Sequence, residues 1–243
     1  MTLHRPVKPP RKLAAVIFDV DGVLLESPHE RAWREALDGF ADPGRFTTRM
    51  YQAVVAGKPR LDGARAALRA LRVSDADDRA EDYAERKQGR LEALIEKGGV
   101  EPFPDGLRFI EAIEALGWPM AAASASKNAN QMMEPLELAS GEPLLKAFAV
   151  NLCGLDVTRS KPDPEIYLAA ATALDVEPQA CLVVEDAAVG IQAARAGAMA
   201  SLGVARLGDA ELLHAVEADL VVESLDAVDL DALATGQLSA VTA

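Results

Sequence analysis

The sequence has little cysteine and no long apolar run. Cys153 and Cys181 are the only cysteines among 243 residues, and both lie within or beside apolar stretches. We therefore expect two buried thiols in a reducing compartment rather than a disulfide. No stretch has the length and apolarity of a membrane span, and residues 1–12 lack the apolar segment of a secretory signal. These absences predict a cytoplasmic protein.

Basic residues are also scarce. The chain has 25 Lys and Arg against 38 Asp and Glu, which gives a formal net charge of −13. Because nucleic acids and anionic lipid surfaces bind clustered cations, this balance argues against a nucleic-acid or membrane partner. An anionic substrate would need a local positive patch or a metal ion. With 50% hydrophobic and 26% charged residues, the chain has the composition of an ordinary globular protein.

The pattern of apolar residues changes along the chain. Residues 13–18 form an apolar run typical of a buried strand, and residues 28–99 then show only helical spacing. From residue 100 onward, short apolar runs alternate with helical segments, which predicts a parallel sheet with right-handed crossovers. We expect an α/β core of residues 12–27 and 100–233, an all-helical insertion of residues 28–99, and flexible tails at residues 1–11 and 234–243.

Two acids mark the end of the first apolar run. Asp19 and Asp21 follow it, and Gly22 allows a sharp turn directly after them. Ligands of open parallel sheets bind at the carboxyl ends of the strands, so these carboxylates are placed to act on a substrate. Two close carboxylates repel each other unless a positive group lies between them, which favours a hard cation. A strand followed by an Asp-rich turn is the simpler alternative.

Three further motifs carry residues of catalytic types. Ser124 ends an apolar segment, Lys161 precedes a proline, and the pair Glu185-Asp186 follows another apolar segment. Alone, these motifs could be a strand end, an exposed turn and an acidic helix cap, respectively. Together with the Asp-x-Asp-Gly motif, and in this order, they resemble the haloacid dehalogenase-like superfamily of phosphotransferases.

This resemblance implies both a fold and a set of roles. The fold would be a three-layer, doubly wound parallel sheet of Rossmann-like topology with an inserted all-helical cap domain. Asp19 would attack phosphorus to give an aspartyl-phosphate, and Asp21 would be the general acid and base. Ser124 would donate a hydrogen bond to the phosphoryl group, and Lys161 would neutralise its charge. These types suit phosphoryl transfer, which depends on positioning and on charge stabilisation.

The resemblance also implies a bound Mg²⁺ ion. Asp19, the backbone carbonyl of Asp21, and Asp186 would hold it, with Glu185 nearby. The ion would offset the repulsion between the attacking carboxylate and the phosphate. The second carboxylate of the first motif argues against a dehalogenase, which lacks it.

Within the superfamily, the sequence is similar to the β-phosphoglucomutases. The loop that follows residue 123 nearly matches the phosphate-loop signature of that branch. The match implies that Ala125, Ser126, Lys127 and Asn128 bind a distal phosphate or the sugar. Successive backbone donors at the start of a helix suit an anion. A polar loop ahead of a helix is the alternative.

Three residues of the helical insertion match the same branch. His29 corresponds to the hinge histidine that relays cap closure to the acid and base. Arg60 corresponds to the arginine that grips the non-transferring phosphate, a task that suits its planar donors. Lys87 corresponds to a lysine that reaches the sugar hydroxyls. An exposed helix-start histidine and a solvated helix face are the alternatives for His29 and Lys87.

These expectations lead to a Mg²⁺-dependent phosphomutase that interconverts β-D-glucose 1-phosphate and glucose 6-phosphate through an aspartyl-phosphate and a bisphosphate. A phosphatase acting on a small sugar phosphate or another phosphorylated metabolite is the main alternative, and a non-catalytic phosphate-binding protein is a third. The linker between Asp21 and His29 is shorter than the resemblance leads us to expect, and Pro59 stiffens the clamp loop. Both departures leave the sugar open. We expect a monomer, because the cap shows no large apolar patch.

Overall fold

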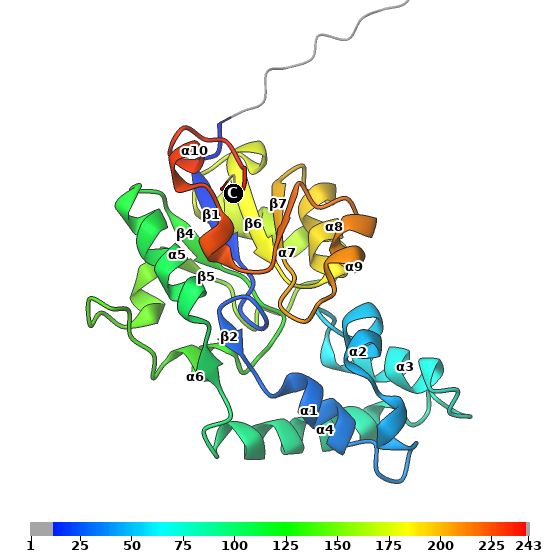
Figure 1. Ribbon diagram of the computed structural model, residues 1–243. Coiled ribbons are helices and arrows are strands. Elements are labelled where there is room, and N and C mark those ends of the chain that lie inside the picture. The colour runs from blue at the N-terminus through cyan, green and yellow to red at the C-terminus, as the bar shows by residue number, and fades with distance from the viewer. Residues whose placement is uncertain (1–11, 242–243) are drawn as a thin grey trace, which may run out of the picture.

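The computed structural model describes residues 12–241 and contains a parallel sheet of six strands in the order β5-β4-β1-β6-β7-β8 (Figure 1). Strand β1, at the centre of the sheet, is rich in branched residues and fully buried, as expected for a parallel sheet covered on both faces. The strands are β1 (Ala15–Phe18), β4 (Met120–Ala122), β5 (Val150–Asn151), β6 (Cys181–Glu185), β7 (Ala200–Val204) and β8 (Leu220–Val222).

Helices cover both faces of this sheet. Helices α5 and α6 pack against the face that carries Val16 and Phe18, whereas α7 and α8 pack against the face that carries Ala15 and Ile17. The helices of this part are α5 (Pro104–Ala115), α6 (Ala129–Met133), α7 (Glu165–Ala173), α8 (Ala188–Ala196), α9 (Ala210–Ala215) and α10 (Leu230–Ala234), with 3-10 turns at Leu144–Ala147, Pro178–Ala180 and Leu225–Ala227. The three layers confirm the predicted fold class.

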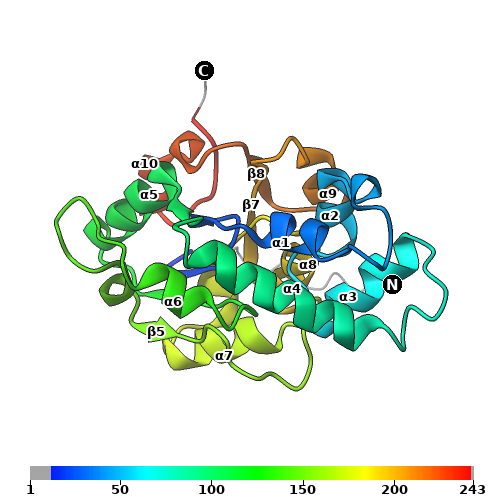
Figure 2. The same cartoon turned by 90° about the horizontal axis from the view of Figure 1, so that it is seen from below.

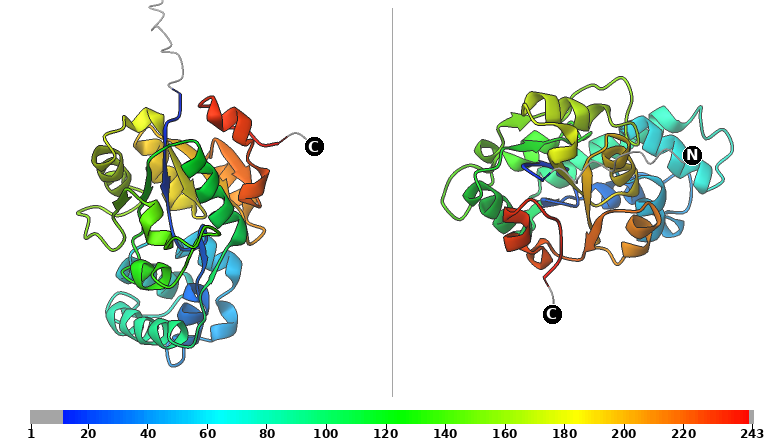
Figure 3. Two further views of the ribbon diagram at one scale, coloured as in Figure 1. Left: turned by 90° about the vertical axis from the view of Figure 1, so that its left-hand side faces the viewer. Right: turned by 90° about the horizontal axis from the view of Figure 1, so that it is seen from above.

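A group of helices lies below the carboxyl edge of the sheet (Figures 1 and 3). It contains α1 (His29–Glu35), α2 (Thr48–Val54), α3 (Arg60–Ala70) and α4 (Ala80–Ile95), with a 3-10 turn at Pro43–Arg45. Figure 2, seen from below, shows α4 running across the front of this group. We call residues 28–99 the cap and the α/β part the core.

The cap has an apolar cluster of its own. The ring of Tyr83 packs against the rings of Trp33 and Phe40, and the centroid distance is 5.2 Å in each of these two pairs. The buried Tyr83 hydroxyl donates to the carbonyl oxygen of Trp33 at 2.8 Å, so this polar atom costs little to bury. The guanidinium of Arg79 lies 4.5 Å from the centroid of the Phe40 ring and covers its outer side.

Two short strands join the core and the cap. Strand β2 (Leu25–Glu26) pairs antiparallel with β3 (Glu101–Pro102), so the outgoing and returning connections run side by side. The sequence did not predict these strands, because two residues are too few to show alternation. The pairing holds the cap beneath the carboxyl edge of the sheet.

Two expectations from the sequence differ from the structure. Residues 131–138 have the spacing of a helix, but the helix found there, α6, begins at Ala129 and ends at Met133. Pro135 has no N–H with which to continue the hydrogen bonds of the helix. The tail expected to be loose from residue 234 is hydrogen-bonded to the core as far as it is described. The Leu13 N–H donates to the Gly236 carbonyl at 3.1 Å, and the Val241 N–H donates to the Ala227 carbonyl at 2.9 Å. The other expected tail, residues 1–11, lies outside the described residues.

Two further expectations from the sequence concern the burial of the thiols and membrane-spanning segments. Cys181 is buried and Cys153 is partly exposed, and both are free thiols. Among residues 12–241, none of the helices combines the length and the apolarity of a membrane span.

Candidate active site

A cavity of about 250 Å³ lies between the carboxyl edge of the sheet and the cap. Strands β1, β4 and β6 end within one residue of one another, since Phe18 is opposite both Ala122 and Val184. The residues that follow these strands therefore meet at one edge, as the sequence predicts. The predicted site residues that line the cavity are Asp19, Asp21, His29, Arg60, Lys87, Ser124, Ala125, Ser126, Lys127, Asn128, Lys161 and Asp186.

Glu185 is the predicted site residue that lies behind the cavity wall. Its side chain is fully buried, and its Oε1 accepts hydrogen bonds from Lys161 Nζ at 2.6 Å and from the Tyr167 hydroxyl. Its Oε2 accepts from the Ala187 N–H at 3.1 Å. Lys161 Nζ also donates to Asp19 Oδ1 at 2.7 Å. Glu185 therefore holds Lys161 in place beside Asp19.

Negative charge exceeds positive charge at this edge. Oxygen atoms of Asp19, Glu185 and Asp186 lie within 4.8 Å of one another. Burial raises the pKa of Asp19 to about 7 although Lys161 lowers it. Burial, Glu185 and Asp19 together raise the pKa of Asp186 well above its ordinary value. In addition, the buried Oδ1 of Asp21 has no hydrogen-bond partner. This oxygen-rich cluster fits a divalent cation, which would relieve the repulsion.

Two glycines allow the carboxylates to come this close. Gly22 has φ of +80°, and a Cβ at this position would lie 2.0 Å from Asp186 Oδ2. A Cβ at Gly190, on α8, would lie 1.8 Å from Glu185 Oε1. Gly22 was predicted as a turn residue, whereas the need for Gly190 becomes visible only when α8 is packed on β6.

Cap side chains reach the second carboxylate of the Asp-x-Asp motif. His29 Nε2 lies 3.5 Å from Asp21 Oδ1, and Lys87 Nζ lies 3.2 Å from His29 Nδ1. Burial, followed by the charge of Lys87, lowers the pKa of His29 to about 4, so its ring is neutral at pH 7. Burial likewise lowers the pKa of Lys87 to about 7. Lys87 is only 3% exposed, so the structure does not place it on a solvated face.

Serine hydroxyls fix the backbone of the loop after β4. The Ser126 N–H donates to Ser124 Oγ at 3.1 Å, and the Asn128 N–H donates to Ser126 Oγ at 3.3 Å. Gln88 of the cap donates to Asn128 Oδ1 at 3.2 Å, so cap and core touch at this loop.

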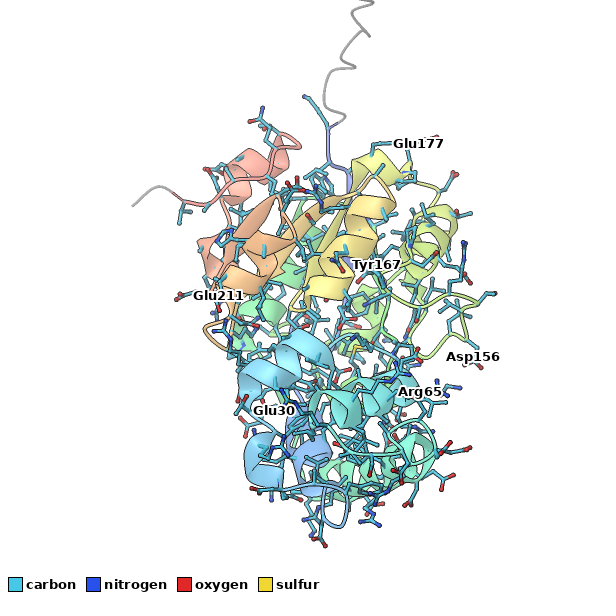
Figure 4. All side chains as sticks on the ribbon, turned by 90° about the vertical axis from the view of Figure 1, so that its right-hand side faces the viewer. Glu30, Arg65, Asp156, Tyr167, Glu177 and Glu211 are labelled. Atoms are coloured by element: carbon cyan, nitrogen blue, oxygen red, sulfur yellow. The ribbon has the colours of Figure 1, made fainter. Side chains whose placement is uncertain are left out.

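An exposed ion pair lies on each flank of the molecule. Lys127 forms an exposed ion pair with Asp156 at 2.8 Å. Figure 4 shows Asp156 of the core and Arg65 of the cap on one flank of the molecule, with Glu211 on the opposite flank. Glu211 pairs with Arg49 of the cap at 2.7 Å. Arg60, the first residue of α3, lines the cavity and is exposed.

Two tyrosines were not singled out in the sequence. Tyr51, on α2, lines the cavity, and burial together with Asp186 and Asp21 raises its pKa well above the ordinary value. Its hydroxyl is therefore protonated at neutral pH and available as a donor. Tyr167, on α7, supports Glu185 from behind. Both occupy apolar faces of helices, where their spacing indicates only core packing.

Comparison with known proteins identifies the family of the chain. The model of the haloacid dehalogenase-like hydrolase family matches residues 13–197. A β-phosphoglucomutase of Mycobacterium bovis is 32% identical over 241 residues, which cover 89% of this chain and 91% of the relative. A fructose-1-phosphate phosphatase of Escherichia coli is 32% identical over 202 residues, covering 79% of this chain and 97% of the relative.

Solved structures show the same likeness. The crystal structure of an archaeal β-phosphoglucomutase from Pyrococcus sp. strain ST 04 superposes with a TM-score of 0.72 at 27% identity, covering 90% of this chain and 96% of that one. A β-phosphoglucomutase from Clostridium difficile gives a TM-score of 0.72 at 28% identity, with coverages of 88% and 92%. The chain therefore belongs to the haloacid dehalogenase-like hydrolase family and is an enzyme of its phosphotransferase and phosphatase group.

Proposed function

We propose that the protein is a Mg²⁺-dependent phosphomutase that interconverts β-D-glucose 1-phosphate and glucose 6-phosphate. The observation that carries this proposal is that two sets of side chains able to bind phosphate line one cavity. Lys161 and Ser124 lie beside Asp19 at the core end of the cavity. Arg60 of the cap and the loop of residues 125–128 line the remainder of the cavity. In a phosphomutase, the phosphate moves from one end of the sugar to the other through a bisphosphate. This intermediate carries a phosphate at both ends and therefore needs both sets of groups.

The carboxylate cluster suits Mg²⁺ because this ion prefers oxygen ligands. Asp19, the backbone carbonyl of Asp21, and Asp186 would hold the ion, with Glu185 nearby. When bound, it supplies positive charge that offsets the repulsion between the carboxylates and a phosphate.

The groups of the chain itself then have distinct tasks. Asp19 attacks phosphorus and forms an aspartyl-phosphate as the bond from phosphorus to the sugar oxygen breaks. Asp21 donates a proton to that oxygen, and later takes one from the accepting hydroxyl. His29, a cap side chain whose ring is neutral at pH 7, lies 3.5 Å from Asp21. Lys161 offsets charge on the phosphoryl group, and Ser124 donates a hydrogen bond to it.

The choice between mutase and phosphatase depends on which acceptor reaches the aspartyl-phosphate. Two contacts join the cap to the core at the cavity: Gln88 donates to Asn128 Oδ1, and His29 Nε2 lies 3.5 Å from Asp21 Oδ1. A closed cap excludes water and favours a sugar hydroxyl as acceptor. The likeness to a fructose-1-phosphate phosphatase supports the second candidate, a phosphatase of small sugar phosphates. A purely binding role has less support, because every group that the chemistry needs lines the cavity or backs it.

The products distinguish these functions. Purified protein is incubated with β-D-glucose 1-phosphate, Mg²⁺ and a trace of glucose 1,6-bisphosphate, and glucose 6-phosphate and free phosphate are measured separately. We expect glucose 6-phosphate without stoichiometric phosphate release. Phosphate as the only product would contradict the mutase and support the phosphatase. No product here or from a panel of phosphate esters would support a binding role.

The Arg60→Ala variant tests the phosphate clamp of the cap. We expect the mutase rate to fall by about 10- to 100-fold, since a charge-assisted hydrogen bond contributes about 1.5–3 kcal/mol. Hydrolysis of p-nitrophenyl phosphate, which has no second phosphate site to fill, should change much less. Arg65→Ala is the matched control, because Arg65 lies on the same helix and pairs only at the surface, with Asp62 at 3.4 Å. Equal losses on both substrates would show that Arg60 does not grip a second phosphate.

Thermal unfolding tests the metal site without any substrate. At about 100 times its dissociation constant, Mg²⁺ should stabilise the folded protein by about 2.7 kcal/mol, or roughly 5–10 °C. Asp186→Asn should abolish this shift. In EDTA it should be at least as stable as wild type, because it removes a buried repelling carboxylate. Asp78→Asn, at an exposed acid of the cap, should keep the full shift. An equal Mg²⁺ shift in Asp186→Asn would exclude Asp186 as a ligand.

A further inference from the structure

Arg206 lies outside the cavity, just after β7, and its side chain is only 11% exposed. Its Nε donates to the carbonyl oxygen of Gly22 at 3.1 Å, and its Nη2 donates to that of Val23 at 2.9 Å. Both carbonyls belong to the tight turn that follows Asp21. A carbonyl buried without a partner costs free energy comparable to a lost hydrogen bond. The guanidinium thus satisfies two carbonyls of this turn.

The third nitrogen of the guanidinium is held by Asp105, in the first turn of α5. Arg206 Nη1 donates to Asp105 Oδ2 at 3.0 Å. The same oxygen accepts from Ser224 Oγ and from the Leu225 N–H, each at 2.8 Å. Burial alone would raise the pKa of Asp105, but these hydrogen bonds lower it below its ordinary value. With all three nitrogens in use, the planar fork of arginine is required here.

Arg206 also contacts the connection that returns from the cap. Its guanidinium carbon lies 3.8 Å from the centroid of the Phe103 ring. Phe103 directly follows β3, and its N–H donates to the Leu24 carbonyl at 2.8 Å. One side chain therefore touches both the turn next to Asp21 and the connection that returns from the cap.

We propose that Arg206 is a positioning residue, which fixes the turn after Asp21 and the connection that returns from the cap, and thereby sets the rate of phosphoryl transfer. The proposal rests on the proposed role of Asp21 as acid and base. Asp21 must be held in register with Asp19, and a misplacement of about 1 Å can lower a rate by about 100-fold. A residue that only stabilised the core would leave the rate of the folded enzyme unchanged.

Steady-state kinetics of three variants test the proposal. In Arg206→Met we expect kcat for p-nitrophenyl phosphate to fall by about 10- to 100-fold with KM almost unchanged, because activating water on the aspartyl-phosphate needs Asp21 in place. Arg206→Lys should recover part of the loss. Arg108→Met, which breaks an exposed pair with Asp226 at 2.6 Å, should match wild type. All rates are measured well below the unfolding midpoint, with the folded fraction checked by circular dichroism.

Hydrogen exchange provides a readout that needs no activity. The Leu24 and Leu25 N–H groups donate to the Val20 carbonyl at 2.9 and 3.0 Å and report on the turn. In Arg206→Met these amides should exchange about tenfold faster while those of β6 keep their protection, whereas a general loss of stability would speed both. Unchanged exchange in the turn, or a normal kcat, would overturn the proposal.

The role of Arg206 can be tested even if one variant does not fold or if the proposed function is wrong. If Arg206→Met does not fold, Arg206→Lys carries both measurements, with smaller changes of the same sign. If wild type forms no glucose 6-phosphate, the mutase proposal fails. The exchange and aryl phosphate results still decide the role of Arg206, because they do not depend on the sugar.

Discussion

The site depends on one buried amine. Lys161 lies between Asp19 and Glu185, with its Nζ 2.7 and 2.6 Å from their oxygens. A buried ion bridge of this kind is maintained only if further hydrogen bonds satisfy the remaining lone pairs. Tyr167 and the Ala187 N–H supply these bonds to Glu185. Without the amine, two carboxylates would lie uncompensated at adjacent strand ends, and the edge of the sheet could not hold its present geometry.

The amine does not balance all the negative charge around it, and this excess explains how an acidic protein can bind an anion. With a net charge of −13, the surface as a whole repels phosphate. At the cavity, however, a divalent cation beside Asp19 and Asp186 would reverse the local sign. Arg60 adds positive charge from the cap side. In the proposed function, the core would attract the reacting phosphate, and the cap would determine which group the rest of the substrate must carry.

Much of the site could be predicted because it follows strand ends, and strand ends of a parallel sheet meet at one edge. Asp19, Ser124 and Asp186 were identified in this way. The fixed position of Glu185 behind Lys161 and the need for a glycine at residue 190 depend on how α7 and α8 pack on β6, and no local pattern encodes that. The two connections, β2 and β3, are too short to show a period. Arg206 acts across more than 180 residues of chain, as its contact with Gly22 shows.

The central claim is that Asp19 carries the phosphoryl group during turnover. The most direct test is to mix the enzyme with ³²P-labelled β-D-glucose 1-phosphate, quench in acid, and reduce the trapped acyl-phosphate with borohydride, which converts a phosphorylated aspartate to homoserine. Peptide mass spectrometry then locates the modified residue. We expect label on the protein and homoserine at residue 19, and neither in Asp19→Asn. Product formation in wild type with the label on another residue, or with no labelled protein at any time point, would contradict the claim.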